Sequence, residues 1–199
     1  VQSGIASATD IDHWIEYKTD KADGVYCAKG VKAGVWVKSD IPEQDWPVME
    51  NISFHGSVTG PIESLSFVAL AMSTEETRYY LNGVFFDENG IVATDGHRLH
   101  QAKMPSAYNA KAILPRQGVN IILDCAKEEK VSEITIYFGD TKYSVDVGNY
   151  SIQGRLIDGT FPDYVRVIGG TKKHKHVAEF DYVTIKSIAK QAKALHKAN

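Results

Sequence analysis

Three residues with catalytic potential, Asp95, His97 and Arg98, stand close together in the segment VATDGHRL at residues 92–99. Such side chains could act as a general base, a general acid and an anion-binding group. Catalysis of this kind needs a positioned nucleophile, however, and no Ser or Cys nucleophile motif lies nearby. The segment therefore favours another interpretation, a tight turn between two strands in which Gly96 adopts a positive φ.

A metal site is the second chemical possibility for this segment, with Asp95, His97 and His100 as ligands. Alternation along a strand would place His97 and His100 on opposite faces, which argues against shared coordination. The cysteines, Cys27 and Cys125, form no CxxC pair, which argues against a metal cluster and favours a reducing cytoplasm. We expect neither a metal ion nor a cofactor.

The elements that would position this segment follow a repeating order, β-α-β-β-β, twice between residues 52 and 157. The first copy has a strand at 52–58, a helix opened by Gly60-Pro61, and strands at 78–86, 90–94 and 97–103. The second copy has a strand at 111–115, a helix at 116–128, and strands at 132–138, 141–147 and 150–157. Apolar residues at helical spacing mark the first helix: Ile62, Leu65, Val68, Ala69 and Met72. The pattern predicts an α+β fold with helices on one face of antiparallel sheets.

The composition fits a chain with a real core and no membrane span. Hydrophobic residues make up 43% of the 199 residues, and no apolar run approaches about 18 residues. Nothing at the N-terminus resembles a signal peptide, and the first residue is Val1 rather than Met, which suggests a fragment or a processed form. The net charge of −3 divides unevenly, because residues 171–199 carry seven Lys and two acidic residues. A basic tail on an acidic body is compatible with polyanion contact or with an ordinary solvated helix.

The basic tail contains a predicted amphipathic helix at residues 183–198, VTIKSIAKQAKALHKA. Ile185, Ile188, Ala192 and Leu195 form an apolar stripe, and no acidic residue follows Asp181. A second face carries a row of lysines: Lys186, Lys190, Lys193 and Lys197. The row predicts either a solvent-facing surface or contact with phosphates, for which a mobile point charge is suited.

Four segments of the chain resemble the central domain of the bacterial DNA polymerase sliding clamp, the beta subunit of DNA polymerase III. They are RYYLNGVFF (78–86), VATDGHRL (92–99), ILPRQGV (113–119) and LIDGTFPDYVRVI (156–168). Two further segments, SATDIDHWIEY (7–17) and IPEQDWPVM (41–49), resemble a mid-domain strand and the end of that family's first domain.

The resemblance implies three parts of the DNA-clamp fold. Residues 1–51 would be an incomplete first domain, because residues 20–38 resemble strands separated by Gly and show no helical stripe. Residues 52–168 would be a complete central domain. Residues 169–199 would begin a third domain with its first strand and the basic helix.

The same resemblance implies a non-enzymatic processivity factor in the cytoplasm, associated with the nucleoid. Its expected partners are double-stranded DNA, a DNA polymerase, a clamp loader and repair proteins, which would bind through short linear motifs. A homo-oligomeric ring would encircle the DNA, with Lys186, Lys190, Lys193 and Lys197 facing it. Neither a cofactor nor a membrane is implied.

The resemblance also implies a hydrophobic peptide-binding pocket. One wall would be formed by Thr94, Gly96, His97, Arg98 and Leu99, with Leu81 beneath it. A second side would be formed by Pro162, Arg166 and Val167. For Leu81 and Val167 taken singly, core packing is the competing interpretation. The family completes this pocket from its third domain, so a chain that stops at Asn199 is expected to form half of it.

Two other functions stay open at this point. A clamp-like adaptor or decoy could bind the same peptides without forming a ring, which the short first copy and early C-terminus would favour in a complete chain. A hydrolase using Asp95 and His97 is the third hypothesis, and assays for nuclease or phosphatase activity would test it.

Overall fold

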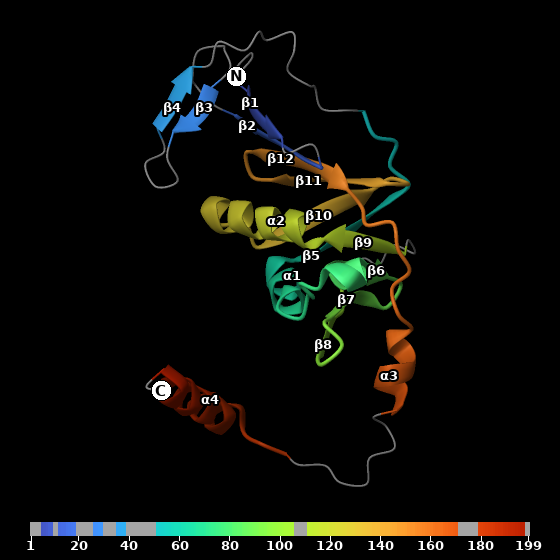
Figure 1. Ribbon diagram of the computed structural model, residues 1–199, viewed down its shortest axis with the longest axis vertical. Helices are drawn as coiled ribbons and strands as arrows, with labels where there is room; N and C mark the ends of the chain where they lie inside the picture. The colour runs from blue at the N-terminus through green and yellow to red at the C-terminus, as the bar shows by residue number, and fades with distance from the viewer. Residues whose placement is uncertain are drawn as a thin grey trace. The chain divides into compact units, whose positions relative to one another are not determined.

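The structure is a computed structural model that describes residues 5–9, 12–18, 26–29, 35–38, 51–105, 111–170 and 179–197 (Figure 1). The chain divides into two compact units, Val1–Phe161 and Pro162–Asn199, which are described separately. Among the described residues, no helix is both long enough and apolar enough to cross a bilayer.

A six-stranded antiparallel sheet dominates the first unit, with strand order β1-β2-β12-β11-β10-β5. Its strands are β1 (Ile5–Thr9), β2 (His13–Lys18), β5 (Gly56–Pro61), β10 (Glu133–Phe138), β11 (Lys142–Val147) and β12 (Tyr150–Arg155). Alternate residues of β10 are buried, which is the pattern of a sheet with one covered and one solvated face.

A four-stranded antiparallel sheet has the order β8-β7-β6-β9. Its strands are β6 (Gly83–Asp87), β7 (Gly90–Thr94), β8 (Leu99–Ala102) and β9 (Ala112–Pro115). A separate hairpin pairs β3 (Tyr26–Lys29) with β4 (Val35–Lys38).

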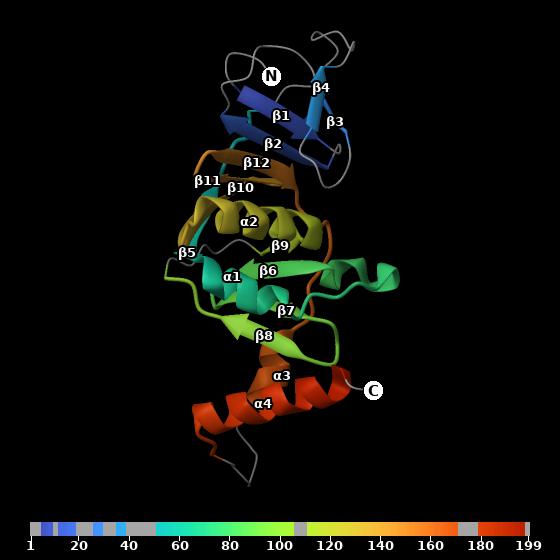
Figure 2. The ribbon, with the colours of Figure 1, turned by 90° about the vertical axis from the view of Figure 1, so that its left-hand side faces the viewer.

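Helices α1 (Ile62–Ala69) and α2 (Arg116–Glu129) lie side by side on the same side of the sheets (Figures 1 and 2). Each follows a proline, Pro61 or Pro115, whose φ of −65° suits entry into the first turn. The core between helices and sheets includes Leu65 of α1 and Ile122 of α2, both fully buried. Burying each such side chain contributes about 1.5–3 kcal/mol, so this shared core holds the two sheets and two helices together.

The predicted duplication is confirmed by the element order, with β5-α1-β6-β7-β8 followed by β9-α2-β10-β11-β12. Each copy gives its first strand to the sheet of the other, because β5 pairs with β10 and β9 pairs with β6. The helices-on-one-face arrangement predicted from the sequence is also confirmed. The strands predicted within residues 20–38 are present as β3 and β4.

Several predicted elements begin or end elsewhere. Residues 78–81 were expected to be extended, but they belong to the 3₁₀ helix η2 (Glu76–Leu81), and the strand starts at Gly83. Two hydrogen bonds draw the ends of this segment together and override the β-propensity of its tyrosines: Leu81 accepts from the amide of Ser73 at 3.1 Å, and Asn82 donates to the carbonyl of Glu75 at 3.0 Å.

Other boundaries shift for similarly local reasons. The strand predicted at 52–58 lies at Gly56–Pro61, in register with β10, and helix α1 ends at Ala69, before Met72. The strand predicted at 97–103 starts only at Leu99, because the preceding residues form a turn. Residues 7–17, matched to one strand, contribute to the hairpin of β1 and β2.

The division into domains at residues 1–51, 52–168 and 169–199 stays a prediction. Strand β2 pairs with β12, so one sheet is continuous across the division predicted after residue 51. The segment IPEQDWPVM and the strand expected before the basic helix lie largely or wholly outside the described residues.

The second unit contains α3 (Tyr164–Gly170) and α4 (Tyr182–Lys197), which confirms the helix predicted at residues 183–198. Asp181 begins α4, since its carboxylate accepts hydrogen bonds from the amides of Val183 at 3.2 Å and Thr184 at 2.7 Å. A hydrogen bond from the Thr184 hydroxyl, together with these two amides, lowers the pKa of Asp181.

Candidate functional site

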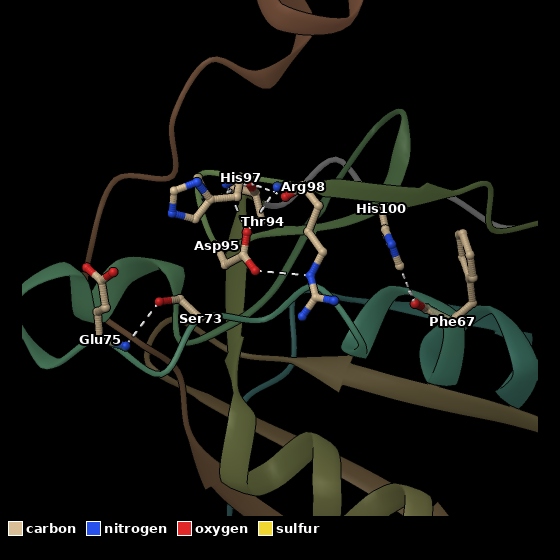
Figure 3. Close-up of polar contacts among 9 residues, drawn as sticks. Phe67, Ser73, Glu75, Thr94, Asp95, His97, Arg98 and His100 are labelled. Carbon is tan, nitrogen blue, oxygen red and sulfur yellow. Dashed lines mark hydrogen bonds and ion pairs between the residues drawn. The ribbon is translucent and has the colours of Figure 1, made fainter. Parts of the chain in front are cut away.

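The turn between β7 and β8 is closed by the Asp95 carboxylate (Figure 3). One carboxylate oxygen, Oδ1, accepts hydrogen bonds from the backbone amides of His97 at 2.9 Å and Arg98 at 3.0 Å. Those two bonds are the main reason that the pKa of Asp95 falls to about 2, with the nearby Arg98 charge adding to the effect. Asp95 is therefore an ionised structural acceptor at neutral pH and a very weak base.

Thr94 closes the same turn from its other end. Its hydroxyl donates to the carbonyl of Arg98 at 2.7 Å and accepts from the amide of Gly96 at 3.1 Å. Gly96 has a φ of +90°, which confirms the positive φ predicted for it. The segment Thr94–Leu99, here called the Gly96 turn, thus has its conformation fixed by its own side chains.

Arg98 projects from this turn with only part of its guanidinium engaged. Its Nε donates to Asp95 Oδ2 at 3.0 Å, and 59% of its side chain is exposed. A guanidinium has further donors on its two terminal nitrogens. Those donors are available at the surface for an incoming oxygen atom.

Arg78 of η2 lies behind the Gly96 turn. Its guanidinium pairs with Glu75, whose Oε2 is 2.8 Å from Nε and 2.7 Å from Nη2. A Cβ atom added at Gly96 would lie 2.8 Å from Nη1 of Arg78, so the guanidinium would have to shift to admit a side chain there. The positive φ of Gly96 is the stronger reason for glycine at this position.

The structure brings one part of the predicted peptide site together. Gly96, His97 and Arg98 are exposed, whereas Thr94 and Leu99 at the turn's ends are half-buried. Leu81 is only 3% exposed, as its core-packing interpretation expects.

The other predicted wall belongs to the second unit. Pro162, Arg166 and Val167 are all exposed, Arg166 and Val167 lie in α3, and the amide of Arg166 donates to Asp163 at 3.3 Å. Whether these residues share a pocket with the Gly96 turn stays a prediction.

His100 has a role that the sequence did not reveal. Its Nδ1 lies 2.8 Å from the carbonyl oxygen of Phe67, and its ring stacks on the Phe67 ring at 4.5 Å (Figure 3). The contact ties edge strand β8 to helix α1. Within the described part of the chain, no group of three His, Cys, Asp or Glu side chains is arranged to hold a metal ion.

Arg78 and Glu75 are also site residues that sequence reasoning missed. The signal was present, because Glu75 and Arg78 are three residues apart, a spacing at which helical side chains meet. The strand predicted at residues 78–86 begins after Glu75, so the prediction assigned the two residues to different elements and concealed their pairing.

A cleft of about 440 Å³ opens elsewhere in the first unit, between η2 and the start of α2. Its lining is mixed, with Tyr79 and Ile157 beside Asn82, Arg116 and Asn120. None of its lining residues belongs to the predicted peptide site. The Gly96 turn is therefore an exposed ledge distinct from this cleft.

The lysine row lies on an exposed helix in the second unit. Lys186, Lys190 and Lys193 are exposed on α4, while the side chain of Lys197 lies outside the described residues. The ammonium of Lys186 is 5.4 Å from the ring centre of Tyr182, which restrains this lysine. Of the predicted apolar stripe, Ile185 is 43% and Ile188 54% exposed.

A family model describes residues 62–163 as the central domain of the DNA polymerase III beta subunit, and this match spans half of the chain. The chain belongs to the DNA polymerase III beta subunit family. The matched region includes Leu81, the whole Gly96 turn and Pro162, whereas Arg166, Val167 and α4 lie beyond it.

Curated relatives of the beta subunit family carry the name beta sliding clamp. The protein of Pseudomonas aeruginosa is 34% identical over an aligned stretch of 160 residues, which covers 71% of this chain and 43% of that protein. The protein of Escherichia coli K12 is 33% identical over 144 residues, covering 65% of this chain and 38% of that protein. The chain thus spans about two fifths of the length of these relatives.

Solved structures of beta subunits share the fold. The sliding clamp of Bartonella birtlesii, solved with griselimycin bound, has a TM-score of 0.66 and 26% identity, covering 84% of this chain and 58% of that one. The sliding clamp of Caulobacter crescentus has a TM-score of 0.62 and 26% identity, covering 81% and 56%. The clamp fold predicted from the sequence is therefore confirmed.

Proposed function

We propose that this chain is the non-catalytic, peptide-binding and DNA-facing part of a sliding clamp. The observation that carries the proposal is the Gly96 turn, an exposed ledge of fixed conformation inside the segment that matches the beta subunit family. Through this ledge the clamp would tether a DNA polymerase, a clamp loader and repair proteins. Tethering raises the effective concentration of a polymerase at its template and so its processivity.

The proposed ligand is a short peptide with one or two large apolar anchors. Burying a Leu or Phe anchor contributes roughly 1.5–3 kcal/mol, and two anchors with a few hydrogen bonds give roughly micromolar affinity. The backbone amides of His97 and Arg98 already donate to Asp95, so the peptide would bond to their side chains instead. The full proposed site comprises Leu81, Thr94, Gly96, His97, Arg98, Leu99, Pro162, Arg166 and Val167.

A binding role agrees better with the electrostatics than the hydrolase hypothesis. A general base works best with a pKa near the working pH. The pKa of Asp95 is about 2, far below that range, because two backbone amides stabilise its ionised form. The residue is suited to holding a turn and poorly suited to accepting a proton.

Fluorescence anisotropy with a labelled peptide bearing adjacent Leu and Phe residues would test the proposed binding. We expect a dissociation constant of roughly 1–100 µM. The matched control is the same peptide with both anchors changed to Ala, which should bind at least about tenfold more weakly. Equal binding of the two peptides, or no saturation by about 1 mM, would contradict the proposed site.

The lysine row of α4 is proposed to face duplex DNA. No acidic side chain occurs in the sequence after Asp181, and Lys186, Lys190 and Lys193 are exposed. Each phosphate neutralised should steepen the log–log salt dependence of DNA affinity by about 0.9. Changing Lys186, Lys190, Lys193 and Lys197 to Gln should therefore flatten that slope by about 2–4.

The charge-matched control for this experiment changes exposed lysines of the first unit, Lys18, Lys103, Lys111 and Lys127. These substitutions alter net charge equally, so a specific contact predicts a much smaller effect from them. If both sets of substitutions flatten the salt dependence equally, the lysines of α4 act through net charge alone, and the proposed contact with DNA is contradicted.

The adaptor or decoy hypothesis predicts a monomer, whereas a clamp ring needs several copies. The clamp interpretation is favoured by the name that the curated relatives share. Light scattering on the full-length product distinguishes the two. A mass of several subunits supports a ring, and a stable monomer that binds the peptide supports the adaptor.

A further inference from the structure

We infer that Asp95 is a positioning residue of the peptide site, which aims the terminal nitrogens of Arg98 at a neutral carbonyl oxygen of the bound peptide. The inference rests on the proposed function, since it concerns the same ledge. Asp95 would not touch the peptide itself. It acts through Arg98, to which Oδ2 is bonded at 3.0 Å.

The two oxygens of Asp95 have separate tasks. Oδ1 accepts the amides of His97 and Arg98 and so shapes the backbone. Oδ2 accepts Nε of Arg98 and so restricts the side chain. The Nε bond occupies the inner edge of the guanidinium, and the donors left over are those at its outer end. An arginine held in this way loses less conformational freedom when it binds a ligand.

Arg78 provides an internal contrast, because it also pairs with a carboxylate three residues before it. Both its Nε and Nη2 donate to Glu75, and its Nη1 lies against Gly96. Its side chain is 36% exposed, against 59% for Arg98. Arg78 is therefore a support behind the turn, whereas Arg98 presents donors outward.

The charge of the pair indicates which oxygen it binds. Asp95 is ionised at neutral pH, so Asp95 and Arg98 together carry no net charge, and the pair exerts little long-range attraction on an anion. The terminal nitrogens of Arg98 then bind an acceptor chiefly through hydrogen bonds, which depend on its position more than on its charge. A neutral amide or backbone carbonyl in the peptide should bind about as well as a carboxylate at the same place, with weak dependence on salt.

The substitution Asp95→Asn separates the two tasks. Its remaining oxygen can still accept the turn amides, but its NH₂ group cannot accept Nε–H of Arg98. We expect this variant to bind the Leu-Phe peptide about three- to tenfold more weakly than the wild type. In an Arg98→Ala background, where no guanidinium is left to aim, the same substitution should change affinity by less than about 1.5-fold.

Asp146→Asn is the matched control. Asp146 lies on β11 of the other sheet, is exposed, and accepts a hydrogen bond from Ser151 at 2.7 Å. This variant removes the same charge from the surface and keeps an oxygen that can still accept from Ser151, and peptide affinity should not change. A wild type that fails to bind the peptide contradicts the proposed function itself. A wild type that binds, with Asp95→Asn equally harmful in both backgrounds or harmless in both, overturns only the positioning role.

Two readouts guard against a variant that merely loses its fold. The Arg98 Nε–H resonance in an NMR spectrum should shift and exchange faster in Asp95→Asn and stay unchanged in Asp146→Asn. Arg98→Lys keeps the charge, but an ammonium group lacks the planar set of donors with which a guanidinium can bind Asp95 and a peptide at the same time. It should therefore lose about as much affinity as Arg98→Ala, and wild-type affinity in Arg98→Lys would refute the role of the aimed guanidinium.

Discussion

The two β-α-β-β-β copies of the first unit share a core but differ in what joins helix to sheet. In the second copy, α2 ends at Glu129 and is capped by Lys130, which is left-handed at φ 57° and donates its amide to the carbonyl of Ala126, and β10 begins at Glu133. In the first copy, α1 ends at Ala69 and β6 begins only at Gly83. The longer connection holds η2, and with it Arg78 and Leu81.

The second hairpins of the two copies differ in the same way. The β11–β12 hairpin turns at Gly148 with φ +59°, and Asn149 is held by Glu129 of α2. The β7–β8 hairpin has a longer turn, closed by Thr94 and Asp95 and backed by Arg78. The candidate site therefore lies where the first copy departs from the repeat. The second copy keeps the shorter connections and shares the core on which the first copy packs.

The largest effect should come from the core that both copies share. Ile91 of the first copy and Ile136 of the second are both fully buried, with 0% accessible surface. Ile91→Ala and Ile136→Ala should each lower the free energy of unfolding by about 2–5 kcal/mol, through lost burial and the cavity left behind. Denaturant unfolding followed by circular dichroism and by fluorescence measures this loss.

One cooperative transition should be seen with both probes, because the copies exchange strands and share one core. Two separate transitions, each moved by only one of the substitutions, would mean that the copies are independently stable.

A pair of glycine substitutions should separate the two hairpins. Gly96→Ala forces a side chain into a positive φ beside Arg78, which costs about 1–2 kcal/mol of stability and distorts the proposed ledge. Gly148→Ala should cost about as much, about 1–2 kcal/mol, because its φ of +59° is also positive and its Cβ would press on the Glu129 side chain. Thermal melts and peptide titrations measure both effects.

Only Gly96→Ala should weaken peptide binding, by about tenfold or more, if the ledge is the site. Should both variants lose affinity to the same extent, overall destabilisation would explain the loss, and the first hairpin would have no special role.

The end of α2 offers a smaller test. Lys130→Gly should raise the free energy of unfolding by about 0.5–1 kcal/mol, because glycine adopts the left-handed conformation without steric cost. Lys127→Gly, three residues earlier inside the helix, should lower it by a similar amount. If the free energy of unfolding falls in both variants, the Lys130 side chain stabilises the fold by more than its left-handed backbone conformation destabilises it.

The repeat could be predicted from the sequence because it rests on local patterns. Pro61 and Pro115 stand directly before the two helices. Apolar and polar residues alternate along β10 and β11 because one face of the sheet is buried. The conformation of Gly96 could also be predicted, since a glycine in a short polar segment between two apolar runs indicates a turn.

The contacts behind the turn could not be predicted in this way. Tyr79 and Tyr80 favour a strand locally, and the hydrogen bonds to Ser73 and Glu75 help to close the segment into η2. The stacking of His100 on Phe67 joins residues 33 positions apart, and no local spacing indicates it. Long-range contacts of this kind decide which side chains surround a site that local patterns can only locate.

The smallest expected effect concerns acid and the first hairpin alone. The pKa of Asp95 is lowered from 3.8 to about 2 in the folded protein, so its contribution to stability is present above about pH 4 and is lost as the pH falls through about 2. The difference in melting temperature between wild type and Asp95→Asn should therefore be constant from about pH 5 to 8 and shrink below about pH 4. Melts at closely spaced pH values measure it, with the Asp95 carboxyl carbon resonance reporting the titration directly. A difference that disappears already near pH 5 would mean that the carboxylate is not held by the turn amides, and the contrast between a self-closed first hairpin and a helix-tethered second one would be lost.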